Sequence, residues 1–125
     1  MKRILVTGSR KWTDKMAVLR TLNKAVGFLD PDGDPYDVII VHGGADGADE
    51  LADQVAVGNG WHIEEYEYDP MLYEGDPRNR NTYMVDLGAD LCVAFYIPPI
   101  GRKGGTRDCY EKAITAGINT WVVQE

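Results

Sequence analysis

The chain has 125 residues, of which 44% are hydrophobic, and this size suits one compact domain over residues 1–125 with a core of its own. Thirteen Lys and Arg residues against twenty Asp and Glu residues give a formal charge of −7, which disfavours a general attraction to nucleic acid or to an anionic membrane. No apolar run approaches the 18 residues or so that a membrane helix needs, and no signal-like segment opens the chain. We therefore expect a cytoplasmic protein without a membrane partner.

The few cysteines and histidines argue against a disulfide framework and against a metal site. Cys92 and Cys109 lie in apolar or helical surroundings and read as reduced thiols. No pair among these cysteines and His42 and His62 has the spacing of zinc ligands, so no metal is expected. Ser9 lacks the Gly-x-Ser-x-Gly turn of serine hydrolases.

Short β-branched runs alternate with segments of helical period, and this pattern predicts an α/β fold with a parallel sheet. The expected strands are residues 3–7, 37–42, 61–68, 90–95 and 120–123, and the expected helices are residues 14–29, 48–57, 80–87 and 106–116. The run over 37–42 is almost continuously apolar, which suits a strand covered on both faces, whereas the more polar run over 61–68 suits an edge strand. The Asp- and Pro-rich residues 30–35 lack the register of a calcium loop and are expected to form an ordinary turn.

Three glycine clusters follow expected strands, over residues 7–10, 42–49 and 101–106. In open α/β sheets ligands collect at the carboxyl ends of the strands, and glycine lets the backbone approach a phosphate closely. Tight turns alone would also explain each cluster. Neither Gly-x-Gly-x-x-Gly nor a Walker loop is present, which disfavours a dehydrogenase or a P-loop ATPase. The candidate phosphate contacts are Gly8, Ser9, Gly43, Gly44, Gly104, Gly105 and Thr106.

Arginines lie close to these clusters. Arg80 stands at the expected start of a helix, where a guanidinium could clamp a phosphate with two hydrogen bonds, although a solvated surface arginine is an equal alternative. Arg10, Arg102 and Arg107 could add positive potential to the same region.

Asp46 and Asp49 have the spacing of a capping box at the start of the helix over 48–57. Asp49 could instead accept a hydrogen bond from a ribose hydroxyl. His42 ends a strand beside the glycines and is more simply a packing residue than a ligand contact. Packing is also the expected role of the tyrosines at positions 66, 68, 73, 83 and 96.

Several of these segments occur together in the order and spacing of a known family. They are Val6-Thr7-Gly8-Ser9-Arg10 with Trp12, Val41-His42-Gly43-Gly44-Ala45 with Gly47-Ala48-Asp49, Arg80-Asn81 with Met84-Val85, and Gly104-Gly105-Thr106 with Asp108. The pattern resembles the YspA-like, YpsA-related family of the SLOG superfamily over nearly the whole chain. Small members of this family are frequent in bacteria and bacteriophages, so the resemblance is compatible with a phage origin.

The resemblance implies a Rossmann-like three-layer sandwich, with a five-stranded, mainly parallel sheet and helices on both faces, that binds a nucleotide or nucleotide-derived ligand. No bound cofactor is expected. Relatives in the superfamily are commonly dimers, so the resemblance is compatible with a homodimer. The related lonely-guy enzymes hydrolyse the N-glycosidic bond of nucleoside 5′-monophosphates with an arginine, matched here by Arg80, and a glutamate three residues after a threonine. Cys109 stands at that second position after Thr106, and the nearest carboxylates are Asp108 and Glu111.

The leading hypothesis from the sequence is therefore a nucleotide-binding domain. Its hypothetical hydrolytic reaction would use Arg80 and Asp108, and Asp49 and Asp108 would face the ribose. Two alternatives remain open, a single-stranded DNA module in the manner of DprA, also a member of the superfamily, and a sensor of a signalling nucleotide without turnover. A strongly acidic chain disfavours the first of these alternatives.

Overall fold

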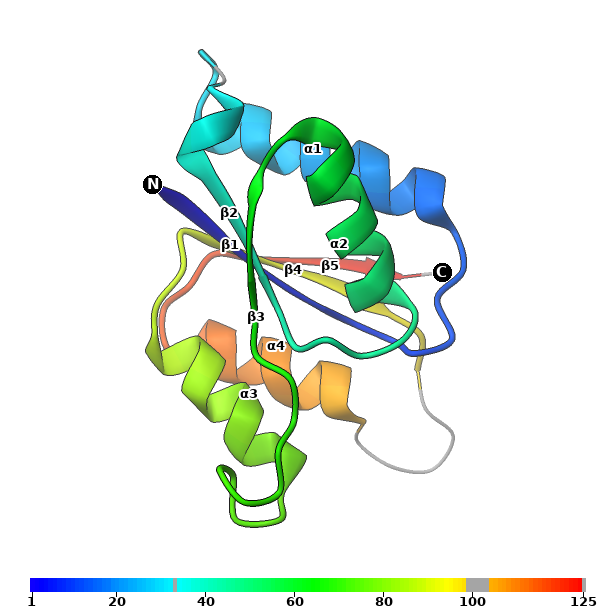
Figure 1. Ribbon diagram of the computed structural model, residues 1–125, viewed down its shortest axis with the longest axis vertical. Coiled ribbons are helices and arrows are strands. Elements are labelled where there is room, and N and C mark those ends of the chain that lie inside the picture. The colour runs from blue at the N-terminus through cyan, green and yellow to red at the C-terminus, as the bar shows by residue number, and fades with distance from the viewer. Residues whose placement is uncertain (33, 99–103, 125) are drawn as a thin grey trace.

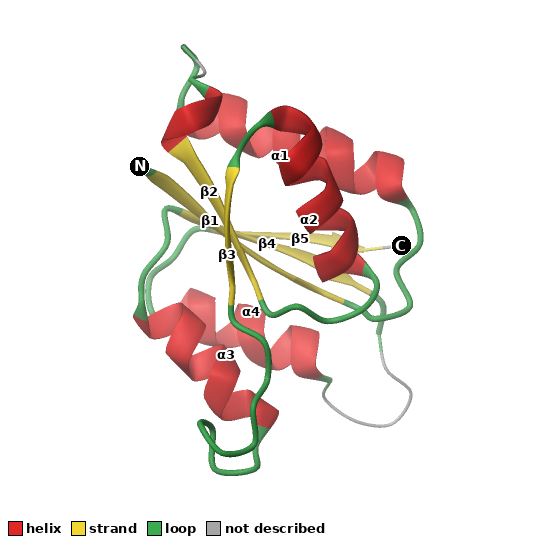
Figure 2. Cartoon of the chain, in the orientation of Figure 1, coloured by secondary structure: helices red, strands yellow, loops and turns green. Residues whose placement is uncertain are grey.

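A computed structural model describes residues 1–32, 34–98 and 104–124 of the chain. They form a five-stranded sheet in the order β3-β2-β1-β4-β5, and every neighbouring pair of strands is parallel (Figures 1 and 2). The strands are β1 (Lys2–Gly8), β2 (Val38–His42), β3 (His62–Glu65), β4 (Leu91–Tyr96) and β5 (Thr120–Gln124). The helices are α1 (Lys15–Leu29), α2 (Ala48–Asn59), α3 (Pro77–Asp86), α4 (Gly105–Thr115) and a short 3-10 helix, η1 (Pro35–Asp37).

The sheet lies between two layers of helices, with α1 and α2 on one face and α3 and α4 on the other (Figure 1). Alternate side chains of β1 enter the two cores, because successive residues of a strand point to opposite faces. Ile4 and Val6 pack with the residues of α1 and α2, and Leu5 packs with Met84 of α3 and Ala113 of α4. The predicted three-layer α/β sandwich is thus confirmed.

The order of the strands sets where a ligand can bind. The chain leaves β1 toward α1 on one face and leaves β4 toward α4 on the other, so the two neighbouring strands send their connections in opposite directions. A crevice forms outside the carboxyl ends of the strands at such a switch point. The fold therefore predicts a binding site where β1 and β4 end.

Two element boundaries differ from the prediction by three residues, and the others lie within two residues of it. The strand expected over 61–68 is confined to His62–Glu65, although it does lie at the edge of the sheet as expected. The helix expected from Arg80 begins at Pro77, because the carboxylate of Asp76 accepts a hydrogen bond from the N–H of Arg78 at 2.9 Å and proline suits the first helical position.

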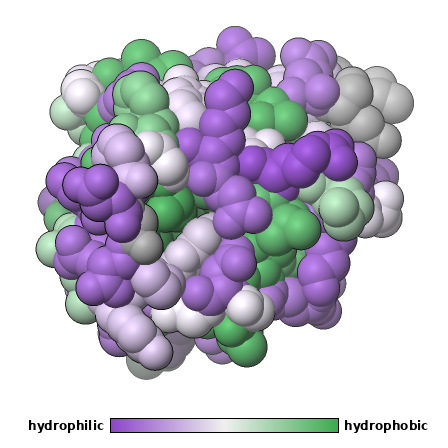
Figure 3. Space-filling model, turned by 90° about the horizontal axis from the view of Figure 1, so that it is seen from above, coloured by the Kyte–Doolittle hydropathy of each residue, from purple (hydrophilic) through white to green (hydrophobic). Residues whose placement is uncertain are grey.

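Among the described residues, no helix is both long and apolar enough to cross a membrane. Hydrophilic residues cover much of the face seen from above and interrupt its hydrophobic patches (Figure 3).

Candidate functional site

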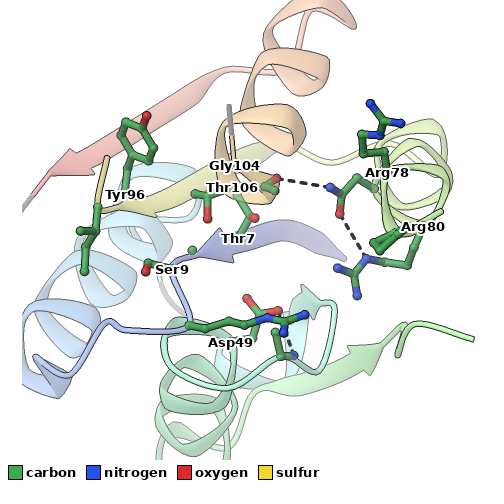
Figure 4. Close-up of a pocket in the computed structure, with 15 residues that line it drawn as sticks. Thr7, Ser9, Asp49, Arg78, Arg80, Tyr96, Gly104 and Thr106 are labelled. Atoms are coloured by element: carbon green, nitrogen blue, oxygen red, sulfur yellow. Dashed lines mark hydrogen bonds between the residues drawn. The ribbon is translucent and has the colours of Figure 1, made fainter. Parts of the chain in front are cut away.

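A cavity of about 460 Å³ opens at the carboxyl ends of β1 and β4, at the predicted switch point (Figure 4). This volume is within the range of small-molecule sites, roughly 300–1,000 Å³. It is lined by Thr7, Gly8, Ser9, Arg10, Ala45, Asp49, Pro77, Arg78, Arg80, Asn81, Tyr96, Ile97, Gly104, Gly105 and Thr106.

The cavity brings together most of the residues singled out in the sequence, from four separate segments of the chain. Those present are Gly8, Ser9, Arg10, Asp49, Arg80, Gly104, Gly105 and Thr106. Gly43, Gly44 and Asp108 do not line it. Arg107 is exposed and bound to Glu111 at 2.7 Å, and Arg102 lies outside the described residues, as do Gly101 and Lys103 of the third glycine cluster. Sequence reasoning did not select Thr7, Ala45, Pro77, Arg78, Asn81, Tyr96 or Ile97.

The end of β1 forms the floor of the cavity. Gly8 is required there because a Cβ at this position would overlap the Cβ of Ala48 in α2. The N–H of Ser9 already donates to the carbonyl of Phe95 at 2.9 Å, so this N–H is not free for a ligand. The Ser9 hydroxyl oxygen accepts from the N–H of Lys11 at 3.1 Å, which leaves its own hydrogen available to donate into the cavity.

The N-terminus of α4 forms one wall of the same cavity. Gly104 is its N-cap residue and makes no side-chain capping hydrogen bond. The first N–H groups of a helix have no intrahelical partner and carry the positive end of the helix dipole. Gly105 and Thr106 therefore offer donors to an anion at the edge of the cavity, and Thr106 adds a hydroxyl.

Arg80 is half-buried and is held by uncharged groups. Its Nη1 donates to the carbonyls of Gly43 at 2.7 Å and Tyr66 at 3.3 Å, and its Nε donates to Oδ1 of Asn81 at 3.1 Å. Figure 4 shows the guanidinium of Arg80 with dashed lines for its hydrogen bonds. Within residues 1–32, 34–98 and 104–124, no carboxylate forms an ion pair with this guanidinium, and Nη2 has no hydrogen-bond partner. Gly43 makes this arrangement possible, because a Cβ on it would overlap the guanidinium.

Asp49 lies at the base of the cavity, near the start of α2, and its side chain is only 5% exposed. The predicted capping box was wrong, because Gly47, with a φ of 74°, is the N-cap residue and no side chain caps the helix. Instead, Oδ2 of Asp49 accepts from the N–H groups of Gly43 at 3.2 Å and Ala45 at 3.3 Å. Burial raises the pKa of Asp49, opposed by the nearby His42, by the hydrogen bond from Ala45 and by Arg80.

Asp108, the carboxylate expected to act in catalysis, belongs to a buried network between α3 and α4. Its Oδ2 accepts from Nζ of Lys112 at 2.9 Å and from Nδ2 of Asn81 at 3.2 Å. The same Asn81 amide donates to the carbonyl of Gly105 at 3.3 Å and accepts from Arg80. The network therefore connects the first turn of α4 to the guanidinium in the cavity.

A second cavity, of about 550 Å³, adjoins the Gly43–Ala45 loop, and Gly44 and Ala45 line it. His42 is buried there, with Nε2 at 2.8 Å from a carboxylate oxygen of Asp53 and with Nδ1 accepting from the N–H of Gly44 at 3.0 Å. This histidine fixes the loop that holds Asp49, and it does not line the first cavity.

Two further side chains bear on the chemistry. Tyr96 lines the first cavity, and its ring also packs against that of Tyr110, just as the rings of Tyr66, Tyr68 and Tyr73 pack against other tyrosine rings. Cys109, which stands where the related hydrolases have a glutamate, is fully buried, and this burial raises the pKa of its thiol to about 11. Such a thiol is protonated at neutral pH and cannot replace a carboxylate.

Comparison with known proteins adds to this geometry. Residues 2–73 match the family described as "YspA, cpYpsA-related SLOG family". The chain is 40% identical to the Gene 61 protein of Mycobacterium phage D29 over 126 residues, which cover 94% of this chain and 93% of that protein. No solved structure matches.

Proposed function

Because the chain belongs to the YspA, cpYpsA-related SLOG family, we propose that it binds a phosphate-bearing nucleotide in the cavity at the ends of β1 and β4. The observation that carries this proposal is the charge of Arg80. In the described part of the chain this half-buried guanidinium is bound only to two carbonyls and an amide oxygen. A cation held in this way beside the uncapped start of a helix favours an anionic ligand.

The phosphate would lie between Arg80 and the first turn of α4. The N–H groups of Gly105 and Thr106 and the hydroxyls of Thr106 and Ser9 are the donors on one side, and the Nη2 group of Arg80 is the donor on the other. Arg10 is exposed at the same cavity and adds positive charge.

A nucleotide fits the cavity better than inorganic phosphate does. Tyr96, Ile97 and Ala45 add apolar and aromatic surface to the lining, and the volume of about 460 Å³ leaves room for more than a phosphate group. Small-molecule sites typically combine such surface with a few polar groups that fix the orientation of the ligand.

Thermal unfolding with a ligand panel tests the proposal. The panel holds nucleoside 5′-monophosphates, NAD, ADP-ribose and cyclic nucleotides, with unphosphorylated nucleosides as controls. A ligand at 100 times its dissociation constant adds ~2.7 kcal/mol, which raises the midpoint of a domain of this size by roughly 10 °C. A shift with phosphorylated members alone supports the proposal. No shift with any of them refutes it, and binding to single-stranded DNA that is lost at higher salt would then favour the DprA-like alternative.

Hydrolysis of the N-glycosidic bond of a nucleoside 5′-monophosphate is the second candidate. One observation favours it, namely that a buried carboxylate, Asp49, lines the same cavity as Arg80 and could stabilise positive charge developing on the sugar. We assign Asp108 to positioning Asn81 rather than to this role, because it lines another cavity and is bound to Lys112. Release of free base, measured by mass spectrometry, identifies a hydrolase, and ligand binding without release identifies a sensor.

A further inference from the structure

Asp49 carries an unpaired oxygen. Its side chain is 5% exposed, and Oδ1 is a buried polar atom without a hydrogen-bond partner among the residues that the structure describes. The other oxygen, Oδ2, accepts from two backbone N–H groups. A buried acceptor without a donor is costly, and the cost is larger for a charged group. Since Asp49 lines the cavity, a bound ligand can supply the missing donor.

Asp49 and Arg80 are attached to the same residue of the loop after β2. The N–H of Gly43 donates to Asp49, and the carbonyl of Gly43 accepts from Arg80. A carboxylate and a guanidinium therefore lie on the two sides of a single glycine, and the positive charge of Arg80 acts on Asp49. A ligand that reaches from the guanidinium of Arg80 to the carboxylate of Asp49 contacts both groups at once.

The chemistry of the two groups sets the order of the ligand along the cavity. Arg80 attracts the phosphate, and the carboxylate of Asp49 repels it, so the part of the ligand at Asp49 is a hydrogen-bond donor next to the phosphate. In a nucleotide the sugar follows the phosphate, and its hydroxyls are donors. Hydrogen bonds from hydroxyl groups to a carboxylate are short and strong. We propose that Oδ1 of Asp49 accepts a hydrogen bond from a sugar hydroxyl and selects ribonucleotides, an inference that rests on the proposed function.

The hydroxyl reaches Oδ1 through a small turn of the carboxyl group. In the free protein Oδ1 has almost no contact with solvent. The torsion about the Cβ–Cγ bond of aspartate is broad, and the two hydrogen bonds that hold Oδ2 are long, at 3.2 and 3.3 Å. This rotation of the carboxyl group therefore costs little free energy, and the ligand donates a hydrogen bond to the oxygen that has no partner in the free protein.

The test compares sugars in the wild type and in Asp49→Asn by isothermal titration calorimetry. The probes are AMP, GMP, CMP and UMP and the 2′,3′-dideoxy counterpart of each. Asparagine keeps an oxygen for the N–H groups of Gly43 and Ala45, so the loop is preserved. Circular dichroism and thermal unfolding check that the variant is folded.

We expect the wild type to bind the ribonucleotide roughly 10- to 100-fold more tightly than its dideoxy counterpart, because the latter leaves Oδ1 unpaired. In Asp49→Asn this ratio should fall below about threefold, while the dideoxy affinity stays the same or rises as negative charge is removed. A purely electrostatic role of Asp49 would change both affinities equally and leave the ratio unchanged, which would overturn the inference.

Two other outcomes also count against the inference. Equal binding of ribo and dideoxy nucleotides by the wild type would overturn the selection of the sugar but leave the proposed function standing. A wild type that binds none of the phosphorylated probes would overturn both.

Discussion

Replacing Arg80 with alanine should weaken the binding of a nucleoside monophosphate by roughly 10- to 150-fold. Nη2 is the part of the guanidinium that no described residue binds, and one charge-assisted hydrogen bond from it to a phosphate contributes about 1.5–3 kcal/mol. The fold should survive, because Arg80 is only half-buried and water can enter the space that its side chain leaves beside the carbonyls of Gly43 and Tyr66. We expect the free energy of unfolding to fall by about 1 kcal/mol, which lowers the melting temperature by roughly 4 °C.

Calorimetric titration of the same nucleotide into matched variants checks this magnitude. Arg78→Ala is the control, because Arg78 lines the same cavity from the same helix but is exposed and bound to Asp76 at 2.8 Å, and we expect less than a threefold change in affinity. Gly43→Ala should weaken binding in the same way although Arg80 itself is kept, because the new Cβ displaces its guanidinium. Equal affinities of the wild type and Arg80→Ala would refute the assignment of Arg80 to the phosphate.

Three further predictions follow from the packing and the charges. Asp108→Asn should lower the free energy of unfolding by about 1–3 kcal/mol, because it weakens the bonds from Lys112 and Asn81, and should weaken nucleotide binding less than Arg80→Ala does. Urea denaturation measures the change in the free energy of unfolding. Loss of turnover without loss of stability would instead indicate that Asp108 is a catalytic residue. Gly8→Ala should destabilise the protein by about 1–3 kcal/mol, because its Cβ overlaps Ala48, and an unchanged melting temperature would contradict the close packing of β1 on α2. Because burial raises the pKa of Asp49, its contribution to stability is present below about pH 4 and is lost as the pH rises through the folded-state pKa. Between pH 4 and pH 7 the free energy of unfolding of the wild type should thus fall relative to that of Asp49→Asn, and parallel pH profiles would argue against a raised pKa of this buried carboxylate.

The fold could be predicted because its signals are local and agree with one another. The apolar run of β2 indicated a strand covered on both faces and the polar run of β3 an edge strand; in the sheet β2 is an inner strand and β3 lies at the edge. The start of α3 at Pro77 could also have been predicted, because Asp76 followed by Pro77 is a helix-start signal. The prediction used the apolar period alone and therefore placed the start too late.

The site was harder to predict because it depends on how the loops turn and on the rotation of the helices. Thr106 and Asp108 are two residues apart on α4, which places them about 200° apart around the helix. Thr106 consequently lines the cavity while Asp108 lies in the network with Asn81, whose role needed contacts between α3 and α4. Asp49 was predicted to be half of a capping box. Instead, the loop that precedes α2 curls around the Asp49 carboxylate, so that the N–H groups of Gly43 and Ala45 donate to it.

Chemical-shift mapping on the ¹⁵N-labelled protein tests the central claim most directly. On addition of a nucleoside 5′-monophosphate, the largest amide shifts should fall at Gly105 and Thr106 and in the loop from Gly43 to Ala45, and the Nε signal of Arg80 should move with them. The unphosphorylated nucleoside should not shift the amides of Gly105 and Thr106. Shifts confined to other surfaces, or no shifts at any nucleotide concentration, would contradict a phosphate site at the ends of β1 and β4.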